Sequence, residues 1–116
     1  MLTAPAGRPL VNLRRYTITP RRMGEFLDVF DRMAMPVLLE TLGPPIGFYT
    51  TVIGSLNQVV HLWAYRDFAD MEARWKARDT HPRFADYLKA SGHLIVAQED
   101  EVVRAVPLPS LAATAG

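Results

Sequence analysis

The clearest pattern in the chain is an alternating run from Gln58 to Tyr65. Successive side chains of a β-strand point to opposite faces, so this run predicts a strand with two different faces. One face is small and purely apolar: Val60, Leu62 and Ala64. The other is large, aromatic and partly polar: Val59, His61, Trp63 and Tyr65. Because helices commonly cover an apolar face, we expect the aromatic face to be uncovered and to line a cavity or an interface.

The N-terminal half predicts a strand followed by a long amphipathic helix. Residues 11–19 alternate, and Thr19 is expected to cap the helix, with Pro20 at its first position. Apolar residues then recur at helical spacing: Met23, Phe26, Leu27, Phe30, Met33, Ala34, Val37 and Leu38. Pro36 should bend this helix, because proline removes one backbone hydrogen bond, and Gly43 should end it.

A hairpin follows, made of strands over residues 48–53 and 59–65. Asp67 or Asp70 is expected to cap a second helix, whose apolar stripe includes Trp75 as a core residue.

The C-terminal half completes the fold. His81 and Pro82 should break the second helix, with His81 capping a short third one that ends at Gly92. Residues 93–104 predict the last strand, with an irregularity over residues 98–101, which are poor strand formers.

The resulting order, β-α-β-β-α-β, predicts an α+β, ferredoxin-like sandwich. In this fold the first and third strands are central neighbours, and the helices cover one face of the sheet. We expect Leu13 to face the helices. The uncovered face would then carry alternate residues of the first strand: Asn12, Arg14, Tyr16 and Ile18.

Composition supports one folded domain and limits the classes of partner that it could bind. The 116 residues are 49% hydrophobic and 22% charged, which argues against disorder. The net charge of +1 gives no electrostatic case for a nucleic acid or an acidic membrane. There are no cysteines, which excludes thiolate chemistry and fits a cytoplasmic location. No apolar run is long enough to span a bilayer, and no His-Glu spacing matches a metal site.

An uncovered aromatic face needs a partner. Tryptophan and tyrosine side chains bury roughly 150 to 250 Å² each when covered, so several of them side by side are more than a monomer usually exposes. We expect a homodimer through the sheet faces. The predicted organisation is an arm over residues 1–9, a domain over residues 10–108 and a tail over residues 109–116.

The expected site combines a cation, a histidine and aromatic rings. Arg14 would hold a carboxylate, enolate or phenolate, or it would form a structural ion pair with Glu99 or Glu101. His61 would act as a base or a hydrogen-bond donor, or it would simply be satisfied at the dimer seam. The candidate catalytic residues are Arg14, His61 and Tyr16. The candidate ligand-binding residues are Asn12, Trp63, Tyr65 and Gln98; no metal or cofactor is expected.

Several segments resemble bacterial NIPSNAP-domain proteins: residues 11–18, 26–37, 46–51, 54–65, 82–84 and 98–99. The run from Asn57 to Trp63 is the most specific of them. The resemblance implies the dimeric α/β-barrel superfamily, whose members include cofactor-free monooxygenases and isomerases. The NIPSNAP family itself has no agreed activity, so the resemblance names no reaction.

Three functions remain open from the sequence. The first is a homodimeric protein that binds a hydrophobic anionic or phenolic compound and, as an enzyme, would oxygenate, isomerise or cyclise it without a cofactor. The second is a non-enzymatic interaction module that uses the sheet face only for dimerisation. The third is an RNA-binding domain of the same strand order, which the missing basic footprint and the missing strand signature oppose.

Overall fold

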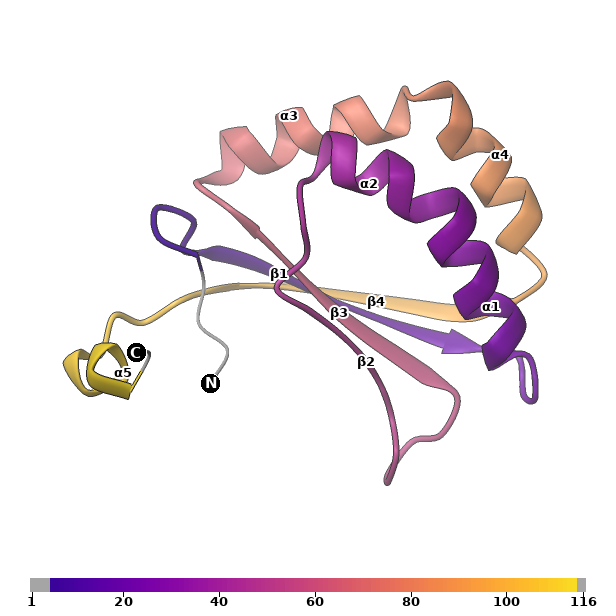
Figure 1. The fold of residues 1–116 in the computed structure, drawn as a ribbon, viewed down its shortest axis with the longest axis horizontal. Coiled ribbons are helices and arrows are strands. Elements are labelled where there is room, and N and C mark those ends of the chain that lie inside the picture. The colour runs from indigo at the N-terminus through magenta and orange to yellow at the C-terminus, as the bar shows by residue number, and fades with distance from the viewer. Residues whose placement is uncertain (1–4, 115–116) are drawn as a thin grey trace.

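The computed structural model describes residues 5–114 and confirms the α+β, ferredoxin-like order (Figure 1). The elements are β1 (Leu10–Ile18), α1 (Met23–Val29), η1 (Phe30–Ala34), α2 (Met35–Thr41), β2 (Gly47–Thr50), β3 (Gln58–Tyr65), α3 (Phe68–Asp79), α4 (Pro82–Ser91), β4 (Ile95–Arg104) and α5 (Pro109–Thr114). The predicted arm and tail both extend outside the described residues. Within the predicted tail, α5 forms a short helix that lies away from the body of the domain.

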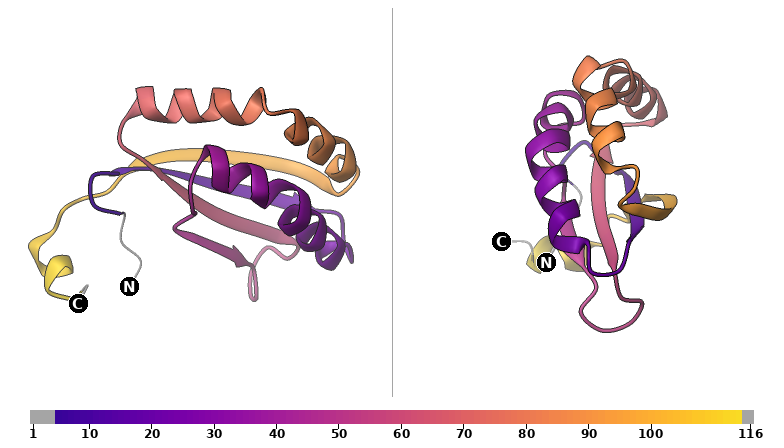
Figure 2. Two further views of the ribbon diagram at one scale, coloured as in Figure 1. Left: turned by 45° about the horizontal axis from the view of Figure 1, so that its top comes forward. Right: turned by 90° about the vertical axis from the view of Figure 1, so that its right-hand side faces the viewer.

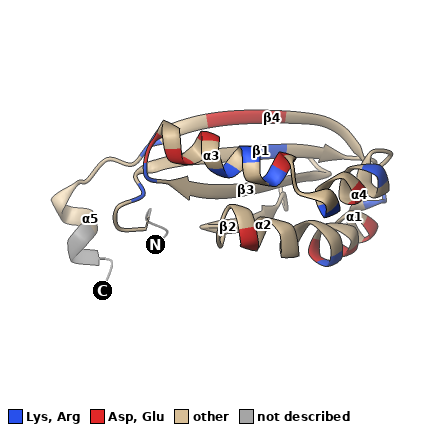
Figure 3. Ribbon diagram, turned by 90° about the horizontal axis from the view of Figure 1, so that it is seen from above, with Lys and Arg blue, Asp and Glu red and all other residues tan. Residues whose placement is uncertain are grey.

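The four strands form one antiparallel sheet in the order β2-β3-β1-β4, so β1 and β3 are central as expected. Arg14 of β1 is paired with His61 of β3 on one side and with Asp100 of β4 on the other. Helices α1 to α4 lie in one layer over a single face of this sheet (Figure 2). Strand β4 lies outside that layer when the domain is seen from above (Figure 3), and beyond Ile95 all of its residues are exposed.

The first helix begins later than the sequence predicts. Thr19 does not cap it, because its hydroxyl donates to the carbonyls of His93 and Leu94 instead. A turn closed by the Arg22 N–H on the Thr19 carbonyl intervenes, and Arg22 takes the N-cap position without a side-chain cap. Asp31 and its neighbours in η1 form a π-helical turn just before Pro36, where the sequence predicts a bend.

The predicted end of this helix is confirmed: Gly43 has a φ of 84°, and its N–H bonds the Leu38 carbonyl. The caps of the later helices are confirmed too. Asp67 accepts from the Asp70 N–H at 2.8 Å, and His81 accepts from the Arg83 N–H at 3.2 Å.

Two strands differ from their predictions. Strand β2 ends at Thr50, so Val52 and Ile53, with 85% and 93% of their surface exposed, belong to the hairpin loop. The irregularity in β4 lies near its start, where the partners of β1 jump from Ala97 to Ile95. The acid-rich residues 98–101 continue the strand without a break.

The aromatic face of the sheet lies beneath the helices, so the predicted assignment of faces is wrong. Trp63 and His61 are 1% exposed and Tyr65 is fully buried. These rings pack in the core with helix residues such as Phe26 and Phe30. Pairing in register places alternate residues of β1 on the same covered side: Leu10, Asn12, Arg14, Tyr16 and Ile18.

The large side chains lie on the helix-covered face because of their volume. A helix layer and a twisted sheet leave a wide space between them, and protein interiors are filled to high density. Ring-sized side chains of β1 and β3 fill that space. The small apolar residues take the opposite face: Val11 and Leu13 of β1 with Val60, Leu62 and Ala64 of β3.

Candidate functional site

A small cavity between the sheet and the helices brings the main sequence candidates together. Its volume of about 20 Å³ is room for one water molecule. Aromatic and aliphatic side chains form most of its wall, and two guanidinium groups and one imidazole supply the polar part. The lining residues are Arg14, Tyr16, Phe30, Leu38, Leu42, His61, Trp63, Arg78, Phe84 and Tyr87.

His61 is held by its neighbour two positions along β3. The indole Nε1–H of Trp63 donates to Nδ1 of His61 at 2.7 Å. Since Nδ1 accepts, the proton of the neutral ring must sit on Nε2. That Nε2 is buried and has no hydrogen-bond partner among the described residues. The ring itself is fixed by Phe48, stacked at 4.9 Å, and by Tyr16, edge-on at 4.8 Å.

This geometry leaves His61 able to donate a hydrogen bond from Nε2 and gives it no free lone pair with which to act as a base. Burial, with a smaller contribution from the positive charge of Arg14, lowers the pKa of His61 to about 3. The ring is neutral at physiological pH, its Nδ1 lone pair is used by Trp63, and its Nε2 already carries a proton. Of the two roles that the sequence leaves open, the geometry favours donation from Nε2–H to an acceptor in the cavity.

Arg14 is the second donor. Its guanidinium carbon lies 5.6 Å from the centre of the Tyr16 ring, and its Nε is buried without a hydrogen bond. Its ionic partner is Asp100, with Nε and Oδ1 separated by 3.4 Å. The expected partners, Glu99 and Glu101, are wrong because alternation along β4 places both on the other face of the sheet.

Tyr16 and Trp63 line the cavity beside these donors. Burial raises the pKa of Tyr16, although Arg14 opposes the shift, so the phenol stays protonated at physiological pH.

The other three candidates lie outside the cavity. Asn12 donates from Nδ2 to Asp100 Oδ1 at 2.7 Å and to the Glu101 carbonyl at 3.1 Å, which positions the acid rather than a ligand. The hydroxyl of Tyr65 accepts from Trp75 Nε1 at 2.9 Å. Gln98 is exposed on β4, paired with Tyr16 in register.

Sequence reasoning missed Arg78 of α3, which also lines the cavity. It is 9% exposed, its guanidinium lies 5.4 Å from the Trp75 ring and 5.5 Å from the Phe84 ring, and its Nε bonds Asp79 Oδ1 at 2.8 Å. The sequence does carry a signal for it. Arg78 follows Met71 and Trp75 at helical spacing, so a charged residue stands on the apolar stripe of the helix.

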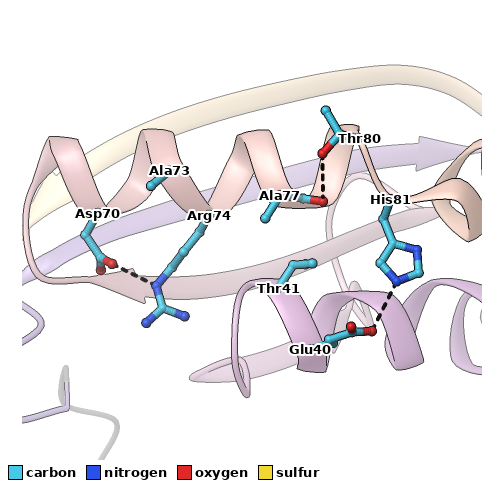
Figure 4. A pocket seen from close by; sticks show the side chains of 8 residues that line it. All are labelled: Glu40, Thr41, Asp70, Ala73, Arg74, Ala77, Thr80 and His81. Atoms are coloured by element: carbon cyan, nitrogen blue, oxygen red, sulfur yellow. Dashed lines mark hydrogen bonds and ion pairs between the residues drawn. The ribbon is translucent and has the colours of Figure 1, made fainter.

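A second hollow, of about 520 Å³, is an open groove between α2 and α3 (Figure 4). Its charged side chains are already paired with one another. Arg74 Nε lies 2.9 Å from Asp70 Oδ1, and His81 Nε2 lies 3.1 Å from Glu40 Oε2. Because its charges are satisfied internally, this groove is the weaker candidate for a ligand site. Among the described residues, no three histidine or acidic side chains come together to hold a metal ion.

Residues 11–109 match the sequence profile of the NIPSNAP family, which is most of the chain. The chain belongs to the NIPSNAP family. No curated protein matches it. Within residues 5–114, no helix is long and apolar enough to cross a membrane.

Solved NIPSNAP structures share the fold. A NIPSNAP family protein of unknown function from Agrobacterium tumefaciens is 22% identical with a TM-score of 0.82, over 91% of this chain and 96% of its own. An uncharacterised NIPSNAP-like domain protein from Burkholderia xenovorans is 31% identical with a TM-score of 0.80, over 89% and 88%. Both relatives are NIPSNAP proteins whose function is unknown, so they support the family and leave the activity open.

A more distant likeness extends beyond the family. A Bacteroides thetaiotaomicron protein, provisionally named an antibiotic biosynthesis monooxygenase, is 24% identical with a TM-score of 0.59, over 90% of this chain and 93% of its own. At that identity the likeness shows the fold alone. The fold that this protein shares is the α+β, ferredoxin-like one with a four-stranded antiparallel sheet.

Proposed function

We propose that this NIPSNAP protein binds a hydrophobic small molecule through an anionic or phenolic oxygen in the cavity beneath the helices. One observation carries the proposal: Arg14 Nε and His61 Nε2 are buried donors without hydrogen bonds, on directly paired residues of the two central strands. A buried donor left unpaired costs about 1 to 3 kcal/mol. A ligand oxygen that accepts from both would recover that cost.

The rest of the cavity suits a ring. Tyr16, Trp63 and Phe84 form an apolar wall around the donors. Since the cavity has room for only about one water molecule, a ligand must displace side chains as it enters.

Two donors on one oxygen would also stabilise an enolate or phenolate. This is the chemistry that a cofactor-free oxygenation, isomerisation or cyclisation requires. In such a reaction Arg14 and His61 would hold the oxyanion, and the proton that the ligand loses would pass to solvent, because the Nδ1 lone pair of His61 is already used by Trp63. The distant fold likeness to a provisionally named monooxygenase is compatible with this chemistry.

The small volume of the cavity favours a second candidate, a non-enzymatic interaction module in which the buried polar groups have no ligand. One experiment separates the two. The protein is titrated with 2-naphthol and with naphthalene, which lacks the oxygen, and binding is followed by tryptophan fluorescence and calorimetry. We expect saturable binding of 2-naphthol and much weaker binding of naphthalene.

Variants test the donors. Arg14→Gln should weaken 2-naphthol binding by about tenfold or more, as expected for loss of a charge-assisted hydrogen bond. The control is Arg15→Gln, which makes the same change on the opposite face of β1 and should leave binding unaltered. Equal binding by the two variants, or no binding of 2-naphthol at all, would contradict the proposal and favour the interaction module.

We also propose that a second copy of the chain covers the other face of the sheet. The apolar residues on its central strands include Leu13, Val60 and Leu62, which are only half-buried. The contact would therefore use the small residues and not the aromatic ones. Light scattering should report a dimer that Leu62→Glu dissociates, whereas Leu88→Glu, at an exposed position of α4, should leave it intact. A monomeric wild-type protein at micromolar concentration would overturn this part of the proposal.

A further inference from the structure

Each guanidinium of the cavity has its own aspartate. Arg78 is bonded to Asp79 at 2.8 Å, and Arg14 faces Asp100 at 3.4 Å. With His61 neutral, the charges around the cavity cancel. The cavity is rich in hydrogen-bond donors but carries no net positive charge.

The two pairs differ in strength. Charge-assisted N–H···O bonds are typically about 2.7 to 2.9 Å long. The pair of Arg14 and Asp100 is longer and lacks hydrogen-bond geometry at Nε. Asp100 Oδ1 is held instead by the Asn12 amide at 2.7 Å. The carboxylate therefore neutralises Arg14 without using its donors.

Asp100 is the more solvent-exposed member of its pair with Arg14. Its side chain is 45% exposed, that of Arg14 only 16%, and β4 lies outside the helix layer. In Figure 3 the acidic stretch of β4 runs beside the basic stretch of β1. A charged group that approached Arg14 from this side would meet the carboxylate of Asp100.

We infer that Asp100 determines the ligand class of this site by excluding permanent carboxylates and admitting ligands that are uncharged on entry, such as phenols and enolisable carbonyl compounds. A ligand carboxylate beside Arg14 would add a second negative charge to a guanidinium that is already neutralised. A phenol or a ketone brings an oxygen acceptor without a charge, and it can accept from Arg14 and His61 while Asp100 remains in place. This inference rests on the proposed function and sharpens it. Of the anionic and phenolic ligands that the proposed function allows, it selects the phenolic ones.

The experiment compares 2-naphthol with 2-naphthoate, which have the same ring system but carry a neutral hydroxyl and a carboxylate at neutral pH. Wild-type protein should bind 2-naphthol about tenfold more tightly than 2-naphthoate, the size expected for one partly screened charge repulsion. Asp100→Asn keeps an acceptor for Asn12 and removes the charge. It should strengthen 2-naphthoate binding about tenfold and change 2-naphthol binding by less than about threefold.

Glu99→Gln is the matched control, because it removes the same charge from the next position on the other face of β4 and should keep the wild-type ratio. If Asp100→Asn does not fold, Asp100→Ser replaces it. An unchanged ratio in the Asp100 variant, with 2-naphthol binding still dependent on Arg14, would overturn this inference and leave the proposed function standing. If 2-naphthol does not bind, or binds independently of Arg14, the proposed function fails and the inference with it.

Discussion

Acid should destabilise this protein through His61. The folded state holds the ring neutral, with a pKa of about 3, whereas a histidine in the unfolded chain has a pKa of about 6.5. Between these values the unfolded chain binds more protons than the folded one, so stability rises with pH across this window. The stability that the neutral ring of His61 contributes is fully present above about pH 6.5 and is lost as the pH falls towards 3.

The magnitude follows from the same two values. At a pH of about 5 the unfolded histidine is almost fully protonated and the folded one is not, which costs about 2 kcal/mol of unfolding free energy relative to a pH of about 8. The assay is urea unfolding at both pH values, at one fixed protein concentration, for the wild type and for His61→Gln. The variant retains every other titrating side chain, including His81 and His93.

We expect the stability advantage of the wild type over His61→Gln to shrink by about 2 kcal/mol on going from the higher to the lower pH. The variant itself is expected to be less stable at the higher pH, because it loses the stacking on Phe48 and the edge contact with Tyr16. A difference between the two proteins that does not change with pH would refute the neutral, buried state of His61. His61 would then not be available as a neutral donor in the cavity.

Four further substitutions test local features by urea unfolding. Gly43→Ala should cost about 1 kcal/mol or more, because a φ of 84° strains a residue with a Cβ, whereas Gly24→Ala, inside α1 with open space around it, should be neutral or stabilising. Asp67→Ala removes the cap of α3 and should cost about 1 kcal/mol; no loss would mean that the cap does not form in solution. Trp63→Phe removes the donor to His61 Nδ1 and should cost about 1 to 3 kcal/mol, and an unchanged stability would argue against that bond.

Local patterns were sufficient to predict most of the fold. Period-two alternation located β1 and β3, and turn chemistry located the stop at Gly43 and the caps at Asp67 and His81. These features depend on a few neighbouring residues. The start of α1 was misplaced because Thr19 bonds backbone far along the chain, near Leu94, which no local pattern encodes.

The facing of the sheet could not be predicted from one strand alone. A polar histidine and large rings on β3 suggest an exposed face. In the structure these large side chains instead fill the space between the helices and the sheet. The sequence of β1 indicates the covered face, because the alternate residues that share a face with Arg14 begin with Leu10 and end with Ile18. Those two ends are 2% exposed and fully buried, respectively, as expected of a covered face.

The sequence predicts which residues form the candidate site better than it predicts how they are arranged. Four of the predicted residues do meet, because they lie on adjacent central strands and point to the same face of the sheet: Arg14, Tyr16, His61 and Trp63. What the sequence could not give was the enclosure, the fixed tautomer of His61 and the contribution of Arg78 from α3. All three depend on how helices settle on the sheet, which is a property of packing between distant segments.

The position of β4 has a consequence for handling the protein. It is a ten-residue strand at the border of the sheet, and one side of its backbone is free of strand partners in the described structure. Such a border can recruit strands from other molecules and start aggregation. The successive acids Glu99, Asp100 and Glu101 oppose this by mutual repulsion between molecules. Variants that neutralise them, including the one used to probe ligand choice, are therefore best kept dilute.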